Sequence, residues 1–275
     1  MTDVFERLEA FYDAVPRDGS RVETFGTLVL FVREGKGWPF YARPRLGAAS
    51  APTTADVAAV RARQRELGIP ESFEWVHETT SRLRDTARSC GLEVLDAPLM
   101  ILDREVIPPA TTHGVRIIDP DSSTFAVDIA AARAVAQIGF GAPGTTAGDA
   151  GPVERDAAMN ALSELEVAEA RRMTRSGRRV TALCEDPVAG ALASGMVQRV
   201  DDVAELVGIA TLPQARRRGF GGAVTAGLVA TVRRAGADLI FLSAGSDEIA
   251  RVYERVGFQR IGTACIADAG VSATQ

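Results

Sequence analysis

The sequence predicts an α/β protein in which two successive units share one order of elements. Three observations support this prediction: the length, the composition and the alternation of strand-like with helix-like segments. At 275 residues the chain is long enough for roughly two domains. Hydrophobic residues make up 46% and charged residues 24%, which is typical of a folded globular protein. Each half contains the series strand, strand, helix, strand, helix, strand.

In the first half, a helix precedes that series. Apolar spacing and the placement of glycine and proline predict the bounds. The expected elements are a helix over 4–15, strands over 27–32 and 38–42, a helix over 57–67, a strand over 73–76, a helix over 80–90 and a strand over 92–102. Gly35 and Gly37 suit a hairpin turn between the first two strands.

A linker is expected near residues 104–113, where Pro108 and Pro109 interrupt both periodicities. The sequence therefore predicts domains at 1–106 and 113–268. The expected elements of the second are a strand over 115–118, a helix over 124–138, a glycine-rich loop, a helix over 155–173, strands over 179–184, 188–200 and 204–211, a turn over 213–219, a helix over 221–234, a strand over 239–242, a helix over 247–256 and a strand over 258–267. The repeated order suggests an ancient duplication.

Charge and cysteine content argue against several functions. The 31 basic and 36 acidic residues give a net charge of −5, which is unlike a protein that coats nucleic acid. Cys90, Cys184 and Cys265 lie far apart, so neither a disulfide framework nor a zinc site is expected. His77 and His113, the only histidines, are isolated, and no metal is expected.

The chain is expected to be cytoplasmic. In segment 1–20 the charged residues Asp3, Glu6, Arg7, Glu9 and Asp13 stand among the apolar ones, unlike the continuous apolar core of a signal peptide. No apolar run approaches the length of a membrane span, so no membrane contact is expected.

The most informative segment is 204–223, with the sequence A-E-L-V-G-I-A-T-L-P-Q-A-R-R-R-G-F-G-G-A. It contains an apolar strand, a sharp turn and a glycine-rich helix start. Gly219, Gly221 and Gly222 allow close approach of a ligand to the backbone, where free N–H groups and the helix dipole attract an anion. Three adjacent arginines raise the local potential further. The segment therefore predicts a pyrophosphate site.

Two other phosphate-binding motifs fit this segment poorly. A Walker loop needs a lysine, and the only lysine is Lys36. A dinucleotide fingerprint starting at Gly219 would need a glycine or alanine where Val224 stands, and its glycines should follow the strand directly.

The segment Arg216-Arg-Arg-Gly-Phe-Gly221 matches the signature [QR]-x-x-G-x-[GA] of the GNAT superfamily of N-acetyltransferases. Downstream, Ile249-Ala-Arg-Val-Tyr-Glu-Arg-Val-Gly-Phe258 resembles the second conserved block of that family, in which a tyrosine lies four residues before a Gly-Phe pair. The two blocks stand in the family's order with the expected elements between them. The resemblance covers roughly residues 113–268.

The resemblance implies a GNAT fold with a splayed sheet, in which acetyl-CoA lies between the strands 204–211 and 239–242. The backbone of the first strand would pair with the pantetheine arm, and the amides of 217–222 would bind the pyrophosphate. Ser246 stands where relatives often have an asparagine that contacts the arm, and a helix N-cap is the expected alternative role. The implied coenzyme-binding residues are Ile209, Ala210, Thr211, Arg216, Arg217, Arg218, Gly219, Phe220, Gly221, Gly222 and Ser246.

The same resemblance implies two catalytic residues. Glu205 occupies the position of a base in the histone-modifying branch, although a solvent-facing glutamate fits equally. Tyr253 matches the general acid that protonates the coenzyme thiolate, the alternative being a tyrosine that only packs. The implied activity is transfer of an acetyl group from acetyl-CoA to a primary amine of a small molecule or peptide, with no other cofactor. The alternative is a non-catalytic acyl-CoA-binding sensor or regulatory protein.

The first half lacks such a phosphate loop, since segment 42–50 contains a single glycine. It resembles a degenerate GNAT copy, and an unrelated accessory domain is the alternative. Such a copy would complete the sheet, form a wall of the acceptor pocket or mediate homodimer formation.

Overall fold

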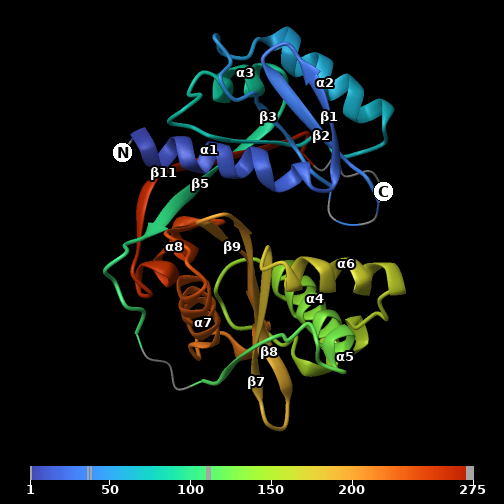
Figure 1. Ribbon diagram of the computed structural model, residues 1–275, viewed down its shortest axis with the longest axis vertical. Helices are drawn as coiled ribbons and strands as arrows, with labels where there is room; N and C mark the ends of the chain where they lie inside the picture. The colour runs from blue at the N-terminus through green and yellow to red at the C-terminus, as the bar shows by residue number, and fades with distance from the viewer. Residues whose placement is uncertain (1, 36, 38, 110–112, 271–275) are drawn as a thin grey trace. The chain divides into compact units, whose positions relative to one another are not determined.

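The computed structural model describes residues 2–35, 37, 39–109 and 113–270 (Figure 1). The chain divides into two compact units, unit 1 with Met1–Leu99 and Ile261–Gln275, and unit 2 with Met100–Arg260. Two strands, β5 (Glu93–Leu102) and β11 (Phe258–Asp268), run from one unit into the other. Both units combine helices with sheet strands, which confirms the predicted mixed α/β class.

Unit 1 packs its helices on strands in the order β1-β2-β3-β4-β11. Neighbouring strands are antiparallel, except that β3 and β4 are parallel. Its apolar core includes Leu30, Val57, Trp75 and Leu83, all fully or almost fully buried. Its remaining elements are α1 (Thr2–Arg17), β1 (Ser20–Phe25), β2 (Leu28–Arg33), β3 (Ala42–Pro44), α2 (Thr54–Glu66), β4 (Phe73–Val76) and α3 (Leu83–Ser89).

The first hairpin differs from the prediction. It joins β1 to β2 through Gly26, whose φ of +56° is the left-handed conformation that glycine adopts without strain. Strand β1 has no buried residue and therefore lacks the apolar run that reveals a strand. The strand predicted over 38–42 corresponds to β3, which begins only at Ala42, and Trp38 lies outside the described residues.

The last strand of the chain belongs mostly to unit 1. In β11, Ala264 pairs with Val76 and Cys265 pairs with Trp75 of β4 in antiparallel register. The sequence order placed this strand with the second unit. The predicted division into 1–106 and 113–268 stays a prediction about separate domains, and residues 110–112 of the predicted linker lie outside the described part.

Unit 2 contains the antiparallel series β9-β8-β7-β6, with β10 added parallel to β9. Its elements besides β5 and β11 are β6 (Val115–Ile117), α4 (Phe125–Gly141), α5 (Pro152–Ala158), α6 (Glu164–Arg175), β7 (Arg179–Asp186), β8 (Gly190–Val200), β9 (Val203–Thr211), the 3₁₀ turn η1 (Pro213–Ala215), α7 (Phe220–Arg234), β10 (Leu239–Ser243) and α8 (Asp247–Glu254).

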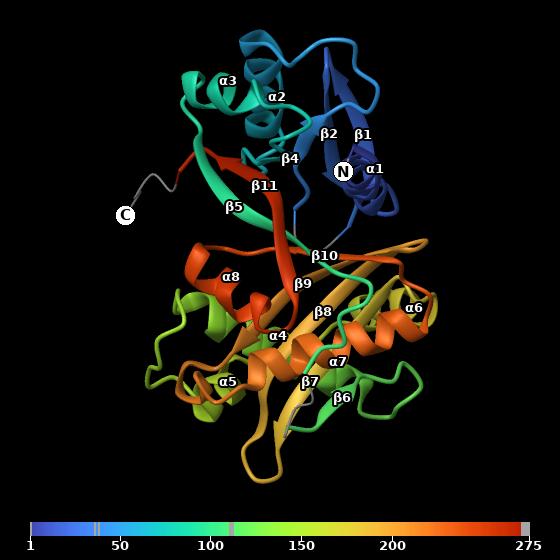
Figure 2. The same cartoon turned by 90° about the vertical axis from the view of Figure 1, so that its left-hand side faces the viewer.

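Helices α4 and α7 cover opposite faces of this sheet (Figure 2). The Ser194 hydroxyl donates a 3.0 Å hydrogen bond to the Ala132 carbonyl of α4. A Cβ added at the next residue, Gly195, would lie 2.7 Å from Val224 of α7. Since successive strand residues point to opposite faces, one helix lies on each side. Gly195 allows α7 to approach β8 closely.

The single helix predicted over 155–173 is wrong, because the structure has α5 and α6 there. Ser163 caps α6: its hydroxyl accepts from the Glu166 N–H, and the Glu166 carboxylate accepts from the Ser163 N–H. This reciprocal pair fixes a new helix start at Glu164.

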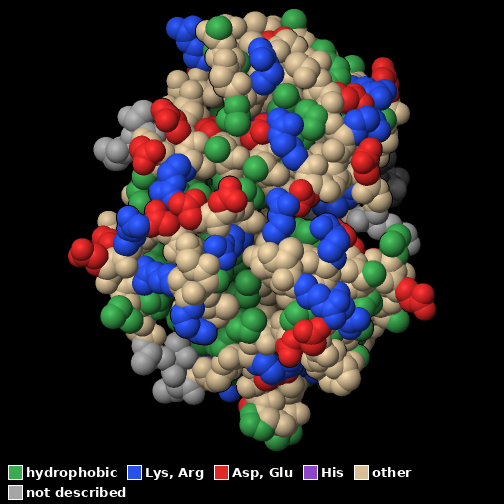
Figure 3. Space-filling model, viewed as in Figure 1, with side chains coloured by type: hydrophobic (Ala, Val, Ile, Leu, Met, Phe, Trp, Pro, Cys, Tyr) green, Lys and Arg blue, Asp and Glu red, His purple; other side chains and the backbone are tan. Residues whose placement is uncertain are grey.

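Charged side chains of both signs are mixed on the face shown in Figure 3. Several form ion pairs, as Arg116 does with Asp128 and Glu185. Among the helices in the described ranges, none has the length and apolar character needed to cross a bilayer. Within the same ranges, no group of three or more histidine, cysteine or acidic residues could hold a metal ion.

Candidate active site

The parallel strands β9 and β10 pair only over a short distance. The pairs are Val203 with Leu239, Ala204 with Ile240 and Glu205 with Phe241. Although β9 continues to Thr211 and β10 to Ser243, no further pair between them occurs in the described residues. One edge of β9 therefore loses its β10 partner after Glu205.

A bulge bends β9 just beyond that point. Ser194 of β8 pairs with Ala210, and Met196 pairs with Val207, so that Gly208 and Ile209 both lie opposite one residue of β8. Gly208 has a φ of +64°, which suits the extra residue of a bulge. Such a bulge turns a strand and increases its twist, and this explains the separation of β9 from β10.

After β9 in the sequence, the chain turns sharply into α7. Arg217 at φ +61° and Gly219 at φ +89° both adopt the left-handed conformation. Gly219 precedes the helix and supplies no side-chain cap. Within the described residues, no hydrogen-bond partner occurs for the backbone N–H groups of Gly219, Phe220, Gly221 and Gly222. Four amides thus remain available at the positive end of the α7 dipole.

Gly221 and Gly222 have no side chain that would cover their amides. A Cβ at Gly221 would lie 3.3 Å from the Thr211 hydroxyl oxygen, and a Cβ at Gly222 would project into open space. The predicted glycine-rich helix start is therefore a backbone surface, and it is suited to an oxyanion.

The three arginines of the signature have different surroundings. Arg217 and Arg218 are exposed. Arg216 instead donates hydrogen bonds to the carbonyls of Gly139 at 2.7 Å, Ala142 at 2.6 Å and Thr146 at 3.1 Å. Burial lowers the pKa of its guanidinium. Arg216 thus caps the carboxyl end of α4 and fixes the loop that follows.

That glycine-rich loop, residues 142–151, also has an attachment at α8. The Thr145 hydroxyl donates to the Glu248 carboxylate. The loop is therefore held by two residues, Arg216, which follows β9, and Glu248, which follows β10. Its many glycines would leave it disordered without such contacts.

Replacement of Arg216 by lysine should destabilise the protein. Lysine keeps the charge but cannot reach three carbonyls at once, so we expect a loss of about 2 kcal/mol in unfolding free energy and a melting temperature lower by about 4–8 °C. Calorimetry in the absence of ligand measures this. Arg217→Lys is the matched control, and equal melting temperatures for the two variants would contradict the capping role.

The two predicted catalytic residues are both buried, each about 9% exposed. Glu205 lies in the last β9–β10 pair, between Gln198 and Phe241, where the strands separate. Tyr253 lies on α8 and contacts the Phe258 ring edge-on, with 6.1 Å between centroids. Burial raises the pKa of Tyr253 to about 12, so the phenol is protonated at neutral pH.

The predicted N-cap at Ser246 is present, since its hydroxyl accepts from the Ile249 N–H at 3.2 Å.

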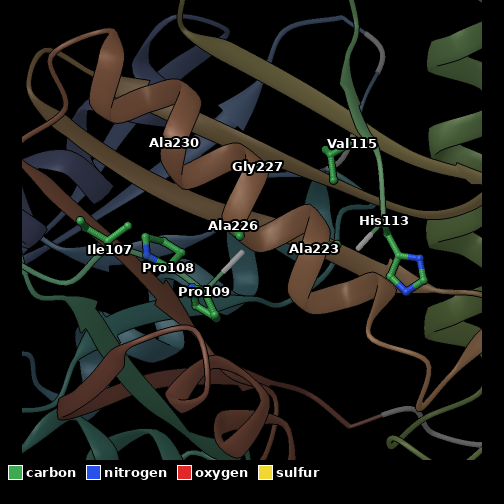
Figure 4. A pocket seen from close by; sticks show the side chains of 9 residues that line it. All are labelled: Ile107, Pro108, Pro109, His113, Val115, Ala223, Ala226, Gly227 and Ala230. Atoms are coloured by element: carbon green, nitrogen blue, oxygen red, sulfur yellow. The ribbon is translucent and has the colours of Figure 1, made fainter. Parts of the chain in front are cut away.

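His113 reaches the same loop, which the sequence did not indicate. Its Nε2 lies 2.7 Å from the Arg218 carbonyl, and its ring stacks on Phe220 with centroids 4.1 Å apart. It stands at one end of a cavity of about 260 Å³ along α7, near the start of that helix (Figure 4).

Solved structures match this fold over almost the whole chain. A GCN5-related N-acetyltransferase from Kribbella flavida has a TM-score of 0.69 at 21% identity, covering 98% of this chain and 97% of that one. A GNAT-family protein from Novosphingobium aromaticivorans, described as a possible acetyltransferase, has a TM-score of 0.54 at 13% identity, with 96% and 94% covered. A tandem GNAT protein from the clavulanic acid biosynthesis pathway has a TM-score of 0.53 at 16% identity, with 89% and 79% covered.

The chain is a GNAT-fold protein, as its resemblance to that superfamily predicted. Its residues 182–267 match the family model of FR47-like proteins, a stretch that begins in β7 and ends in β11. No curated protein sequence matches the chain.

Proposed function

We propose that this chain is an acetyl-CoA-dependent N-acetyltransferase that acts on a primary amine of a small molecule or peptide. The observation that supports this most is the group of four unpartnered amides at residues 219–222, reached directly from the open edge of β9. An extended arm with a pyrophosphate at one end would find a strand edge and an anion site in succession.

In this proposal the backbone of Ile209, Ala210 and Thr211 pairs with the pantetheine arm. The amides of residues 217–222 bind the pyrophosphate, with Arg217 and Arg218 exposed beside them. Arg216 contributes by holding the neighbouring loop, since its guanidinium is engaged by three carbonyls. Ser246 contributes through the start of α8, which it caps.

When bound, acetyl-CoA supplies the thioester. The acceptor nitrogen forms a C–N bond to the carbonyl carbon as the C–S bond breaks. Glu205 accepts the proton that the amine loses, directly or through water, at the point where β9 and β10 separate. Tyr253 gives its phenolic proton to the departing sulfur, which its raised pKa keeps available.

We also propose that residues 1–106 derive from a second GNAT-like copy that no longer binds coenzyme. The match to a tandem GNAT protein supports this. At the place that would correspond to the phosphate loop, Arg43 is fully buried and paired with Glu9 of α1, so it is not available to a phosphate.

Binding of coenzyme tests the proposal. Acetyl-CoA should bind with a stoichiometry of one per chain and raise the melting temperature by several degrees, since a ligand at 100 times its Kd stabilises the native state by about 2.7 kcal/mol. Titration calorimetry and thermal melts measure both.

Saturating coenzyme without heat or melting shift would reject the proposal, and a second molecule at residues 43–48 would reject the degenerate copy. A screen of amines that detects free thiol then separates the enzyme from the acyl-CoA sensor, because only the enzyme releases coenzyme A in the presence of an acceptor.

A further inference from the structure

His113 contacts the pyrophosphate loop in two ways, at the Arg218 backbone carbonyl and at the ring of Phe220. The Arg218 carbonyl can only accept a hydrogen bond, so the Nε2 of His113, 2.7 Å away, is the donor. The two residues stand 105 positions apart in the sequence. The contact therefore joins the start of unit 2 to the loop.

Aromatic packing fixes the ring that makes this hydrogen bond. His113 lies on one ring of Phe220 with an interplanar angle of 28°. Phe220 is itself 3% exposed, and the Arg218 guanidinium lies 5.0 Å from its centroid. Phe220 is thus a buried support against which both the histidine and the preceding arginine are placed.

The direction of the Arg218 carbonyl determines the direction of the next amide. No cis peptide occurs in the described residues, so the peptide between Arg218 and Gly219 is trans. In a trans peptide the C=O and the following N–H point in opposite directions. Because His113 holds the carbonyl on its own side, the Gly219 N–H is directed away from His113.

Gly219 needs such a restraint. With φ at +89° it adopts a conformation that glycine leaves easily, since glycine has the widest choice of backbone conformations. Its N–H has no partner within the described residues, so nothing on that side of the peptide holds it in place.

We propose that His113 is a positioning residue for coenzyme binding: its hydrogen bond to the Arg218 carbonyl aims the Gly219 amide at the pyrophosphate. The inference rests on the proposed function and adds a residue outside the signature to it. In this proposal His113 acts through the Arg218 carbonyl and the Phe220 ring rather than by direct contact with the coenzyme.

Substitution of His113 by glutamine or by asparagine distinguishes a role of its hydrogen bond from a role of its packing alone. The amide nitrogen of glutamine can take the place of Nε2, whereas that of asparagine is one methylene too short. His113→Gln should keep the affinity for coenzyme A within about threefold, and His113→Asn should lower it about tenfold, the usual effect of one lost hydrogen bond. His113→Phe, which keeps the stack, should also lose about tenfold.

Pantetheine serves as the second probe because it has no pyrophosphate. Its affinity should be equal in wild type and all three variants, whereas general damage to the fold would weaken both probes. His77→Phe, at the other histidine, is the matched control and should bind coenzyme A as wild type does.

Equal coenzyme A affinity of wild type and His113→Asn would overturn the inference, and so would a parallel loss for pantetheine. If His113→Phe does not fold, the glutamine and asparagine pair still decides. If wild type binds no coenzyme A, the proposed function is rejected and the role of His113 with it. If wild type binds and the asparagine variant binds equally, only the role of His113 is rejected.

Discussion

Gly221→Glu should abolish coenzyme binding, with a loss of affinity of about a hundredfold or more. The substitution has two effects at one position. Its Cβ would lie 3.3 Å from the Thr211 hydroxyl oxygen, which disturbs the contact between the end of β9 and the start of α7. Its carboxylate would stand among the four amides and repel the pyrophosphate. Titration with coenzyme A measures the loss.

Ala230→Glu provides the matched control. It adds the same charge to an exposed position of the same helix, away from its first turn. Coenzyme affinity should be unchanged in this variant. If Gly221→Glu binds coenzyme A as tightly as Ala230→Glu, the pyrophosphate does not lie on these amides.

Tyr253→Phe should lower turnover by about 10²- to 10⁴-fold, the usual contribution of a general acid. The ring and its edge contact with Phe258 remain, so coenzyme affinity should stay within a few-fold of wild type. A turnover assay with an accepted amine, paired with a binding titration, measures both. A variant slowed by only a few-fold would mean that Tyr253 packs and does not transfer a proton.

Because the pKa of Tyr253 is raised, the Tyr253→Phe variant should also differ from wild type in how its stability depends on pH. Burial favours the neutral phenol, so the folded protein retains a proton that an unfolded tyrosine loses at about pH 10. The resulting stability is present below pH 10 and is lost as the pH rises towards 12. Tyr253→Phe should remove this alkaline loss, which thermal melts between pH 9 and 12 detect.

Glu205→Gln completes the comparison. It should leave coenzyme affinity intact and slow turnover, most strongly at low pH, where the acceptor amine is mostly protonated. A rate close to wild type across the pH range would identify Glu205 as a buried structural residue of the last β9–β10 pair.

Local signals predicted most of the fold. The order of elements in unit 2 agrees with the sequence from β7 onwards, because apolar runs and glycine or proline stops are properties of neighbouring residues. The break between α5 and α6 had such a signal in the capping pattern Ser163-x-x-Glu166, which the prediction overlooked. Strand β1 had none, since its exposed residues depend on β2 alone for pairing.

The parts of the candidate site that consist of consecutive residues could be predicted from the sequence. The glycines of the loop and the tyrosine of α8 belong to contiguous motifs. Arg216 belongs to the motif too, but its contacts are with carbonyls 70 to 77 residues earlier. His113 is more than 100 residues from Arg218. Contacts of that kind depend on the path of the chain through space, and one sequence without relatives does not reveal them.

The pairing of β11 with β4 constrains the order of folding during synthesis. The sheet of unit 1 is incomplete until residues 261–268 have emerged from the ribosome, although its other strands are made first. Until then the edge of β4, with Trp75, offers unpaired backbone groups to any other strand. Contacts between residues far apart in the sequence, such as Val76 and Ala264, also form slowly, because a long loop must close. The nascent N-terminal half should therefore be a client for chaperones.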